Sequence, residues 1–178
     1  MKPPRQPSQA LALYEAGKAQ NFDHQQGLAR LIALGDPETL FRAGRLWPRF
    51  DFAKGFAALA ELHSEKFLYH AGLEWKVFDH DAGLAALLEI RDARYVFYAG
   101  AHWKRFDFEK GTAGLLALAD CEHLYRAGAL WKEFDHAAAW KILESRVAEG
   151  ETWRGLALEN PRWRKALAGI WKDLQKNG

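Results

Sequence analysis

Apolar side chains recur at helical spacing in pairs of short segments, and the pair returns every 28 residues. When each unit is numbered from its opening Phe as position 1, apolar or small residues fall at positions 7, 10, 11 and 13 of the first segment and at positions 19, 22, 23 and 26 of the second. Spacings of three and four residues are typical of amphipathic helices. The pattern therefore predicts two helices in every unit, helix A over positions 3–13 and helix B over positions 16–27.

A Phe-Asp pair opens the units without slippage, at 22/23, 50/51, 78/79, 106/107 and 134/135. A fixed period of this length is typical of stacked repeats, in which one unit cannot bury its apolar face alone. We therefore predict an all-α protein, an α-solenoid of about five tandem 28-residue antiparallel helical hairpins with helical end caps. The architecture resembles that of the tetratricopeptide and HEAT repeats, but the repeat length and pattern differ from theirs, and the resemblance implies no function.

Departures from the repeat define the expected boundaries. Residues 1–7 are rich in proline and predict a disordered N-terminal tail. The segment from Ser8 matches a lone helix B, and the fifth unit loses its pattern soon after it begins. We expect one repeat domain over 8–178, made of a capping helix (8–21), four hairpins (22–49, 50–77, 78–105 and 106–133), and a divergent repeat with C-terminal capping helices (134–178).

Polar and glycine positions predict how each hairpin is built. Asp at position 2, and Asp or Ser at position 15, precede the two helices, where a side-chain oxygen accepts from free N–H groups of the first turn. Glycine recurs at positions 6 and 23, although glycine costs about 1 kcal/mol relative to alanine inside a helix. Since these positions face each other in an antiparallel hairpin, we expect glycine to let the two helix backbones of one hairpin approach closely.

Composition narrows the class of protein. The chain of 178 residues has eight Trp and eleven Phe, a net charge of +2 and one cysteine. A single cysteine excludes an intrachain disulfide framework and fits a reducing compartment. The N-terminal sequence lacks the apolar core of a signal peptide, and no apolar run approaches the roughly 18 residues of a membrane span. We expect a soluble, cytoplasmic protein with no membrane partner.

Residues that could carry chemistry have a simpler interpretation in the core. Position 26 is occupied by Trp47, Trp75, Trp103 and Trp131. These rings could stack on sugars or bases, but their spacing continues the apolar stripe of helix B. His24, His80 and His136 are two hairpins apart, about 20 Å for helices packed 8–10 Å from one another, so they cannot share a metal ion. Cys121 has no counterpart in the other units, and we find no phosphate loop or nucleophile motif, so we predict no enzyme, catalytic residue, metal or cofactor.

Positions 18, 21, 25 and 28 of helix B vary while the rest of the unit stays constant. Their three- and four-residue spacing places them on one stripe of the helix, away from the core stripe. The candidate partner-binding residues on this stripe are Arg42, Arg49, His70, Tyr95, Tyr98, His102, Arg105, His123 and Arg126. Tyrosine and arginine are enriched among the residues that dominate protein interfaces.

The stripe leads us to expect a non-enzymatic binding or scaffold module that recognises a protein or peptide partner. The alternative is a nucleic-acid-binding repeat protein that uses the arginines of the stripe and the basic C-terminal helix. The low net charge counts against this alternative, because affinity for phosphates comes mainly from Lys and Arg. The remaining interpretation is an ordinary solvated face.

Overall fold

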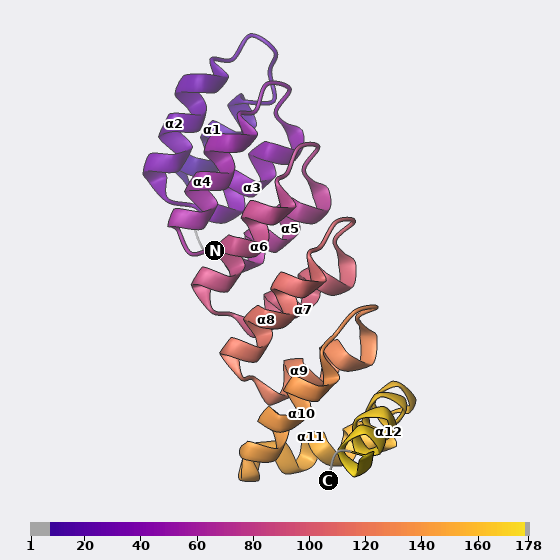
Figure 1. The fold of residues 1–178 in the computed structure, drawn as a ribbon. Coiled ribbons are helices and arrows are strands. Elements are labelled where there is room, and N and C mark those ends of the chain that lie inside the picture. The colour runs from indigo at the N-terminus through magenta and orange to yellow at the C-terminus, as the bar shows by residue number, and fades with distance from the viewer. Residues whose placement is uncertain (1–7, 177–178) are drawn as a thin grey trace, which may run out of the picture. The chain divides into compact units, whose positions relative to one another are not determined.

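The computed structural model describes residues 8–176, and the tail expected at residues 1–7 lies outside the described residues. The described chain is all-α, as predicted, and forms twelve helices (Figure 1). The helices group into two compact units, one up to Ile90 and one from Arg91, and each is described by itself. None of the described helices is long and apolar enough to cross a membrane.

The first unit contains six helices in two rows. Their bounds are α1 (Gln9–Ala16), α2 (His24–Leu34), α3 (Pro37–Leu46), α4 (Phe52–Glu61), α5 (Glu65–Glu74) and α6 (His80–Ile90). Helices α2, α4 and α6 form one row, and α1, α3 and α5 form the other (Figure 1). Helix α3 contacts both α1 and α5, and α2 packs against α3 and α4. Contacts of this kind between neighbours are consistent with a helical repeat.

The second unit begins with the same arrangement and ends differently. Its helices are α7 (Ala93–His102), α8 (Phe108–Leu118), α9 (Cys121–Leu130), α10 (His136–Ser145), α11 (Val147–Glu159) and α12 (Pro161–Lys176). Helix α7 contacts α8 and α9, as α3 contacts α4 and α5 in the first unit. At the C-terminal end of the unit, α12 packs on α9, α10 and α11.

Aspartate side chains begin most of the helices, as the sequence predicts. The Asp23 carboxylate accepts from the backbone N–H of Gln26 at 3.0 Å, at the start of α2. Bonds of the same kind are made by Asp36, Asp51, Asp79, Asp92, Asp107, Asp120 and Asp135. Ser64, before α5, makes no such bond. The carboxylates at positions 2 and 15 therefore serve the fold, and each contributes about 1 kcal/mol to its helix.

Helix B is shorter than the pattern predicts, because its tryptophan leaves the helix. Helix α3 ends at Leu46, and Trp47 takes extended backbone angles of φ −73° and ψ 131°. Trp75, Trp103 and Trp131 follow the ends of α5, α7 and α9 in the same extended conformation. Position 26 therefore ends helix B instead of continuing its stripe.

Trp47, Trp75 and Trp131 lie just after the ends of their B helices, and each packs on the preceding B helix of the same row. The Trp47 indole N–H donates to the Tyr14 carbonyl of α1 at 3.0 Å, and a Cβ added at Gly17 would overlap the indole ring. Trp75 repeats the arrangement on α3, where its N–H donates to a carbonyl at 3.1 Å and a Cβ at Gly44 would lie 2.5 Å from its Nε1. We call this contact the tryptophan seat. It consists of an indole, the glycine at position 23 and the carbonyl at position 20 of the preceding B helix.

The tryptophan seat corrects the expected role of the glycines. The sequence predicted that glycine lets the two backbones of one hairpin meet, yet the atoms nearest to a Cβ at Gly27 or Gly44 belong to aromatic rings. Gly27, at position 6, faces the Phe22 ring of its own unit. A close approach of two backbones occurs instead in the divergent repeat, where a Cβ at Gly150 in α11 would overlap the Leu143 carbonyl of α10. The predicted partner of the recurring glycines was therefore wrong.

Histidine at position 3 belongs to the same aromatic packing. The His24 ring meets the Trp47 ring edge to face at 5.6 Å, and its Nε2 bonds the Gly17 carbonyl at 2.9 Å. His136 makes the corresponding bond to the Gly128 carbonyl, also at 2.9 Å. The His136 ring lies 4.8 Å from that of Trp163, so the prediction that these rings are packed against tryptophan is confirmed for both.

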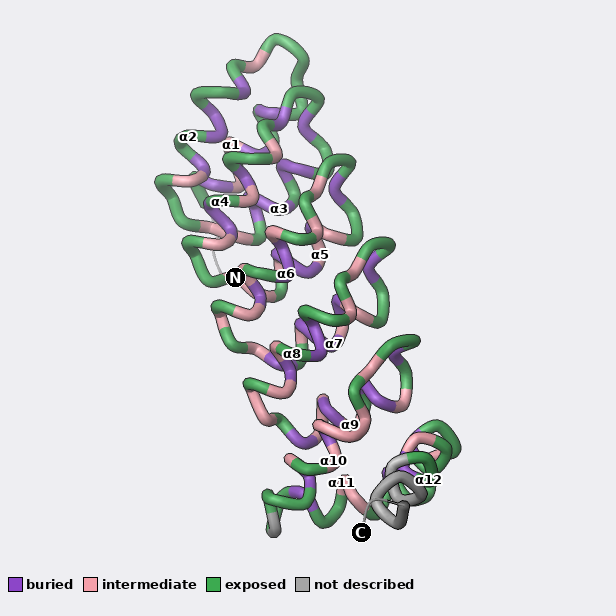
Figure 2. The backbone as a smooth tube through the Cα atoms, in the orientation of Figure 1, coloured by how far each residue is buried: buried purple, intermediate pink, exposed green. Residues whose placement is uncertain are grey.

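The last tryptophan seat is filled by a residue outside the repeat. Trp163 in α12 is fully buried, its ring lies on Gly128, and its indole N–H donates to the Tyr125 carbonyl at 3.0 Å. This bond spans 38 residues of sequence, against 33 or 34 in the other seats. Helix α12 thus supplies the tryptophan that the divergent repeat lacks. Figure 2 shows buried residues among exposed ones along the coloured parts of the helices, as packing against neighbouring helices requires.

Candidate partner-binding surface

In the first unit the predicted stripe lies on α3 and α5, where most of its charges are paired. Arg42 is exposed and forms an ion pair with Glu38, one turn earlier in α3. His70 is half-buried, with its ring 5.9 Å from that of Phe41 and its Nδ1 3.6 Å from the Glu74 carboxylate. Arg49 is exposed in the turn after α3 and forms no ion pair with another described residue. The structure therefore leaves Arg49 as the uncompensated cation among these candidates.

In the second unit, four candidates lie on α7 or directly after it. The rings of Tyr95 and Tyr98 meet edge to face at 5.9 Å, and both residues are half-buried. A ring nitrogen of His102 lies 3.0 Å from the Tyr98 carbonyl, and Arg105 is exposed in the turn that follows the helix. The structure brings these residues together along one helix, as their spacing predicts.

The two candidates on α9 make their polar contacts within their own helix or its cap. His123 places its ring 5.8 Å from that of Phe97 and its Nδ1 2.8 Å from the Asp120 carboxylate. Arg126 is exposed and pairs with Glu122 at 2.7 Å, one turn earlier. An exposed pair of this kind contributes little to stability, but it compensates the charge that Arg126 presents to solvent.

The residues of helix B that are most exposed differ in part from those of the predicted stripe. Position 18 was expected at the surface, but Thr39 is buried and Phe67 is half-buried against the Phe41 ring at 5.6 Å. Positions 17 and 24 are more open, and the residues that the sequence analysis missed there are Glu38, Arg45, Lys66, Leu73, Arg94 and Glu122. A glutamate four residues before an arginine, at 38/42 and 122/126, is the sequence signal that would have found two of them. We call positions 17, 21, 24, 25 and 28, together with the half-buried Tyr95 at position 18, the outward line.

Arg45 joins two helices on the outward line. Its Nε lies 2.9 Å from a carboxylate oxygen of Glu74 on α5, and its guanidinium lies 5.7 Å from the centre of the Phe41 ring. Both partners hold the side chain in place between α3 and α5. The exposed charges of the first unit are therefore largely balanced where these helices meet.

Arg94 gives the second unit a cation beside an aromatic ring. Its guanidinium lies 4.7 Å from the centre of the Tyr95 ring and 3.2 Å from the Asp92 carboxylate. The attraction of this carboxylate raises the pKa of Arg94. Tyr95 therefore contacts both a cation and the ring of Tyr98, and an exposed cation–π contact of this type contributes about 0.5–1 kcal/mol.

Large apolar side chains are exposed near the C-terminal ends of the B helices. Leu46 and Val77 in the first unit are 55% and 62% exposed, and Leu130 in the second is 63% exposed. Single exposed apolar residues are normal on soluble proteins. These three, however, occupy positions 25 and 28, so each lies on the outward line with the charged and aromatic candidates.

The other residues considered for chemistry lie in the core. Cys121 is buried at the start of α9, and burial raises the pKa of its thiol, as does the nearby Glu149 carboxylate. The four tryptophans of position 26 are buried, which confirms their interpretation as core residues. Within the part of the chain that the structure describes, no group of three His, Cys, Asp or Glu side chains could hold a metal ion.

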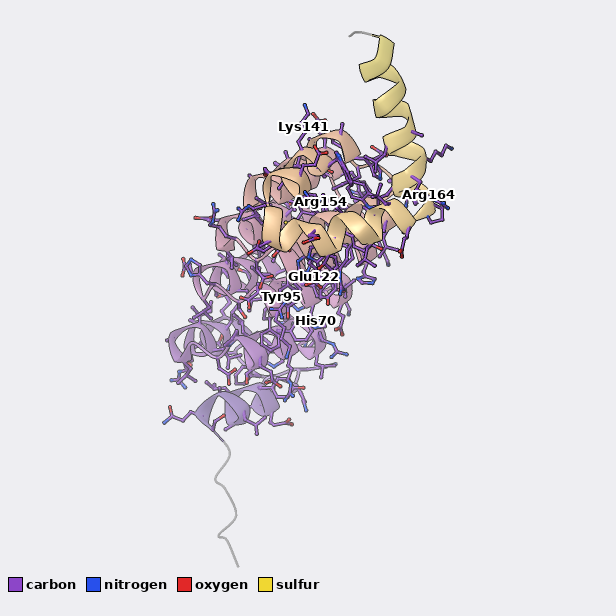
Figure 3. All side chains as sticks on the ribbon, turned by 90° about the horizontal axis from the view of Figure 1, so that it is seen from below. His70, Tyr95, Glu122, Lys141, Arg154 and Arg164 are labelled. Carbon is purple, nitrogen blue, oxygen red and sulfur yellow. The ribbon has the colours of Figure 1, made fainter. Side chains whose placement is uncertain are left out.

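Figure 3 shows the side chains of the candidate surface, with His70 labelled in the first unit and Tyr95 and Glu122 in the second. The chain matches no family model, no curated protein sequence and no solved structure. The chemistry of the exposed residues is therefore the basis for assigning a function.

Proposed function

We propose that this protein is an α-solenoid of tandem 28-residue helical hairpins, and that it acts as a non-enzymatic module that binds a protein or peptide partner through its outward line. The tryptophan seat supports the repeat, because the same indole-to-carbonyl bond recurs in both units. Stacked helical hairpins generate extended surfaces suited to such partners. The proposal includes no catalysis, metal or cofactor.

The observation that carries the proposal is the aromatic cluster on α7. Tyr95 and Tyr98 are half-buried and in mutual contact, and Arg94 lies against the first of them. Rings already held by their neighbours lose little conformational freedom when a partner covers them, so more of the contact energy remains for binding. Tyrosine and arginine in this setting are the residue types that dominate protein interfaces.

The charges of the outward line favour a protein partner over a nucleic acid. Arg42, Arg45 and Arg126 are each paired with a glutamate. A phosphate would have to compete with these carboxylates, whereas binding of nucleic acid depends on uncompensated Lys and Arg. In α12, Arg162 donates to carbonyl groups at the end of α9 and so contributes to the fold. These pairings are the reason that we place the nucleic-acid alternative second.

The test is capture of a partner by the purified protein and by two variants. The surface variant is Tyr98→Ala combined with Arg105→Glu, and the matched control is Glu109→Ala, an exposed change on α8 in the other row. We expect a protein that is retained with and without nuclease, and that the surface variant binds at least about tenfold more weakly than the control once the partner is purified. Circular dichroism checks that all three proteins are folded.

Equal affinity of the partner for the surface variant and the control would refute the proposed surface. Capture of material that nuclease removes, with a logarithmic affinity that falls linearly with the logarithm of salt concentration, would assign the protein to nucleic-acid binding instead.

A further inference from the structure

Helix α1 is a B helix without the A helix that covers its counterparts. Its register is fixed by the tryptophan seat, in which Gly17 takes position 23. In α3 and α5, where α2 and α4 pack alongside, positions 19 and 22 are 0% exposed. These residues are Leu40, Ala43, Leu68 and Ala71. In α1 the corresponding residues are Leu13, which is half-buried, and Ala16, which is exposed. Helix α1 therefore presents a core face that the described chain leaves partly uncovered.

This uncovered face lines a groove of about 620 Å³ between α1 and α2. The groove is lined by Gln9, Ala12, Leu13, Ala16, Arg30, Ala33 and Leu34. Five of these seven side chains are alanine or leucine, so the floor is apolar and shallow enough for a helix to approach closely. The corresponding groove between α3 and α4 is filled by α2, which contacts both of them. The groove between α1 and α2 thus has the surroundings of an A helix that is not among the described residues.

Arg30 distinguishes the groove from the filled ones. It lies at position 9 of helix A, where α4 has the buried residue Ala58 and α6 has Ala86. Arg30 is exposed and forms no ion pair with another described residue. An occupant that buries the apolar floor would therefore bring its own atoms close to an uncompensated guanidinium, and a carboxylate is the group that suits it.

The stacking of α4 and α6 shows which part of an occupying helix would face Arg30. The space between these two helices is lined by positions 11 and 12 of α4, by His63 in the turn after it, and by positions 9, 12 and 13 of α6. Position 12 of one A helix and position 9 of the next therefore border the same space. Position 12 is a glutamate in both helices, Glu61 and Glu89. A helix docked beside α2 in the same register would place such a carboxylate near Arg30.

We infer that the groove between α1 and α2 binds an amphipathic helix of a partner protein, with leucine and small residues in the A-helix pattern and an acidic side chain opposite Arg30. The site lies outside the outward line and does not depend on the function proposed for it. The probe for the test is a peptide with blocked ends and the sequence of residues 79–91, which carries the N-cap, the leucines and the glutamate of α6.

The peptide is titrated into the full-length protein and followed by NMR and calorimetry. We expect saturable binding with shift changes confined to α1 and α2. Ala16→Phe should abolish binding by filling the groove, whereas Ala57→Phe, a change at an exposed alanine of α4, should leave it unchanged. Arg30→Glu should weaken binding about threefold to fivefold, as loss of a surface ion pair predicts. A peptide with Glu89→Lys should recover that loss with the Arg30→Glu protein and lose affinity for the wild type.

The outcomes that overturn the inference are also distinct. Absence of saturable binding at millimolar peptide, or shift changes away from the groove, would show that the groove does not accept such a helix. A concentration-dependent dimer that Ala16→Phe abolishes would assign the groove to a second copy of the chain. Shifts at Ala12 and Ala33 on deletion of residues 2–7 would assign it to the chain's own N-terminal segment.

Discussion

Replacement of Gly100 by alanine should destabilise the protein, although alanine favours helices. A Cβ at Gly100 would lie 2.5 Å from Cζ2 and 2.6 Å from Nε1 of Trp131, which is far inside van der Waals contact. The indole cannot move freely, because it is 1% exposed and packs on the ring of Phe106 at a centroid distance of 5.0 Å. The ring would have to shift by about 1 Å in a close-packed interior.

The expected cost follows from three contributions. Overpacking of a core side chain costs about 1–3 kcal/mol. Displacement of Trp131 also weakens the bond from its indole N–H to the Phe97 carbonyl, now 3.3 Å, and such a bond contributes about 1 kcal/mol. The higher helix propensity of alanine offsets about 1 kcal/mol. We expect a net loss of about 1–3 kcal/mol in the free energy of unfolding, and a larger loss for Gly100→Leu.

Urea unfolding followed by circular dichroism measures the effect, and thermal unfolding should show a decrease of about 2–4 °C per kcal/mol. Gly155→Ala is the matched control, because this glycine is in the interior of α11 and nothing lies within 4 Å of an added Cβ. The control should gain up to about 1 kcal/mol. Trp131→Phe combined with Gly100→Ala should cost less than the sum of the single changes, since a smaller ring leaves room for the methyl group. If Gly100→Ala is as stable as the wild type, the tryptophan seat does not require glycine and the reasoning is wrong.

Three further predictions concern single residues. Trp163→Ala should lower the free energy of unfolding by about 3–5 kcal/mol in denaturant titrations, because the indole is fully buried in the last seat. The backbone N–H of Lys54 donates to the Asp51 carboxylate and lowers its pKa, so this cap stabilises α4 at pH values above the ordinary carboxyl pKa. The stabilisation is lost as the pH falls through the pKa of the folded state. Between about pH 5 and pH 2 the wild type should therefore lose more stability than Asp51→Asn, because asparagine caps the helix without titrating. Burial and the raised pKa of Cys121 should make its reaction with a thiol reagent at pH 8 far slower in the folded protein than in denaturant.

The parts of the fold that depend on neighbours in sequence were predicted from the sequence. Asp23 and Asp36 cap α2 and α3 as their positions require, and the helices between the caps follow the apolar spacing. Helix B ends two residues before the predicted bound. Trp47 takes an extended conformation and bonds to the carbonyl of Tyr14 in α1, 33 residues earlier in the sequence. Helix periodicity carries no information about such a contact.

The role of the recurring glycines could not be derived for a reason specific to repeats. A repeat pattern does not tell whether position 23 contacts position 26 of the same 28-residue repeat or of an adjacent one. The pattern suggested a partner for glycine within its own hairpin, whereas Gly44 meets Trp75 of the following repeat. Trp163 was harder still, because it fills its seat from outside the period.

The displacement of the outward line has a similar origin. The sequence places positions 17 and 18 at adjacent edges of the polar side of helix B, and spacing alone does not say which edge meets the preceding helix of the row. The structure packs the second of them inward, as Phe67 does against Phe41, and leaves Lys66 exposed beside it. Positions 21, 25 and 28 of the outward line were thus found by periodicity, and positions 17 and 24 required the direction in which the row is stacked.

The tryptophan seat also explains why the two ends of the chain differ. Each seat needs a glycine and a carbonyl from one B helix and an indole from the end of the next B helix, or from α12 in the last seat, so the first described B helix only receives an indole. Helix α1 does this, and its other face stays uncovered because nothing in the seat requires an A helix before it. The C-terminal unit ends with α12, which inserts Trp163 and uses Arg162 to bind the carbonyl groups at the end of α9. A packing rule that runs in one direction therefore leaves the apolar docking face on α1, and this is why we expect a partner helix to bind there.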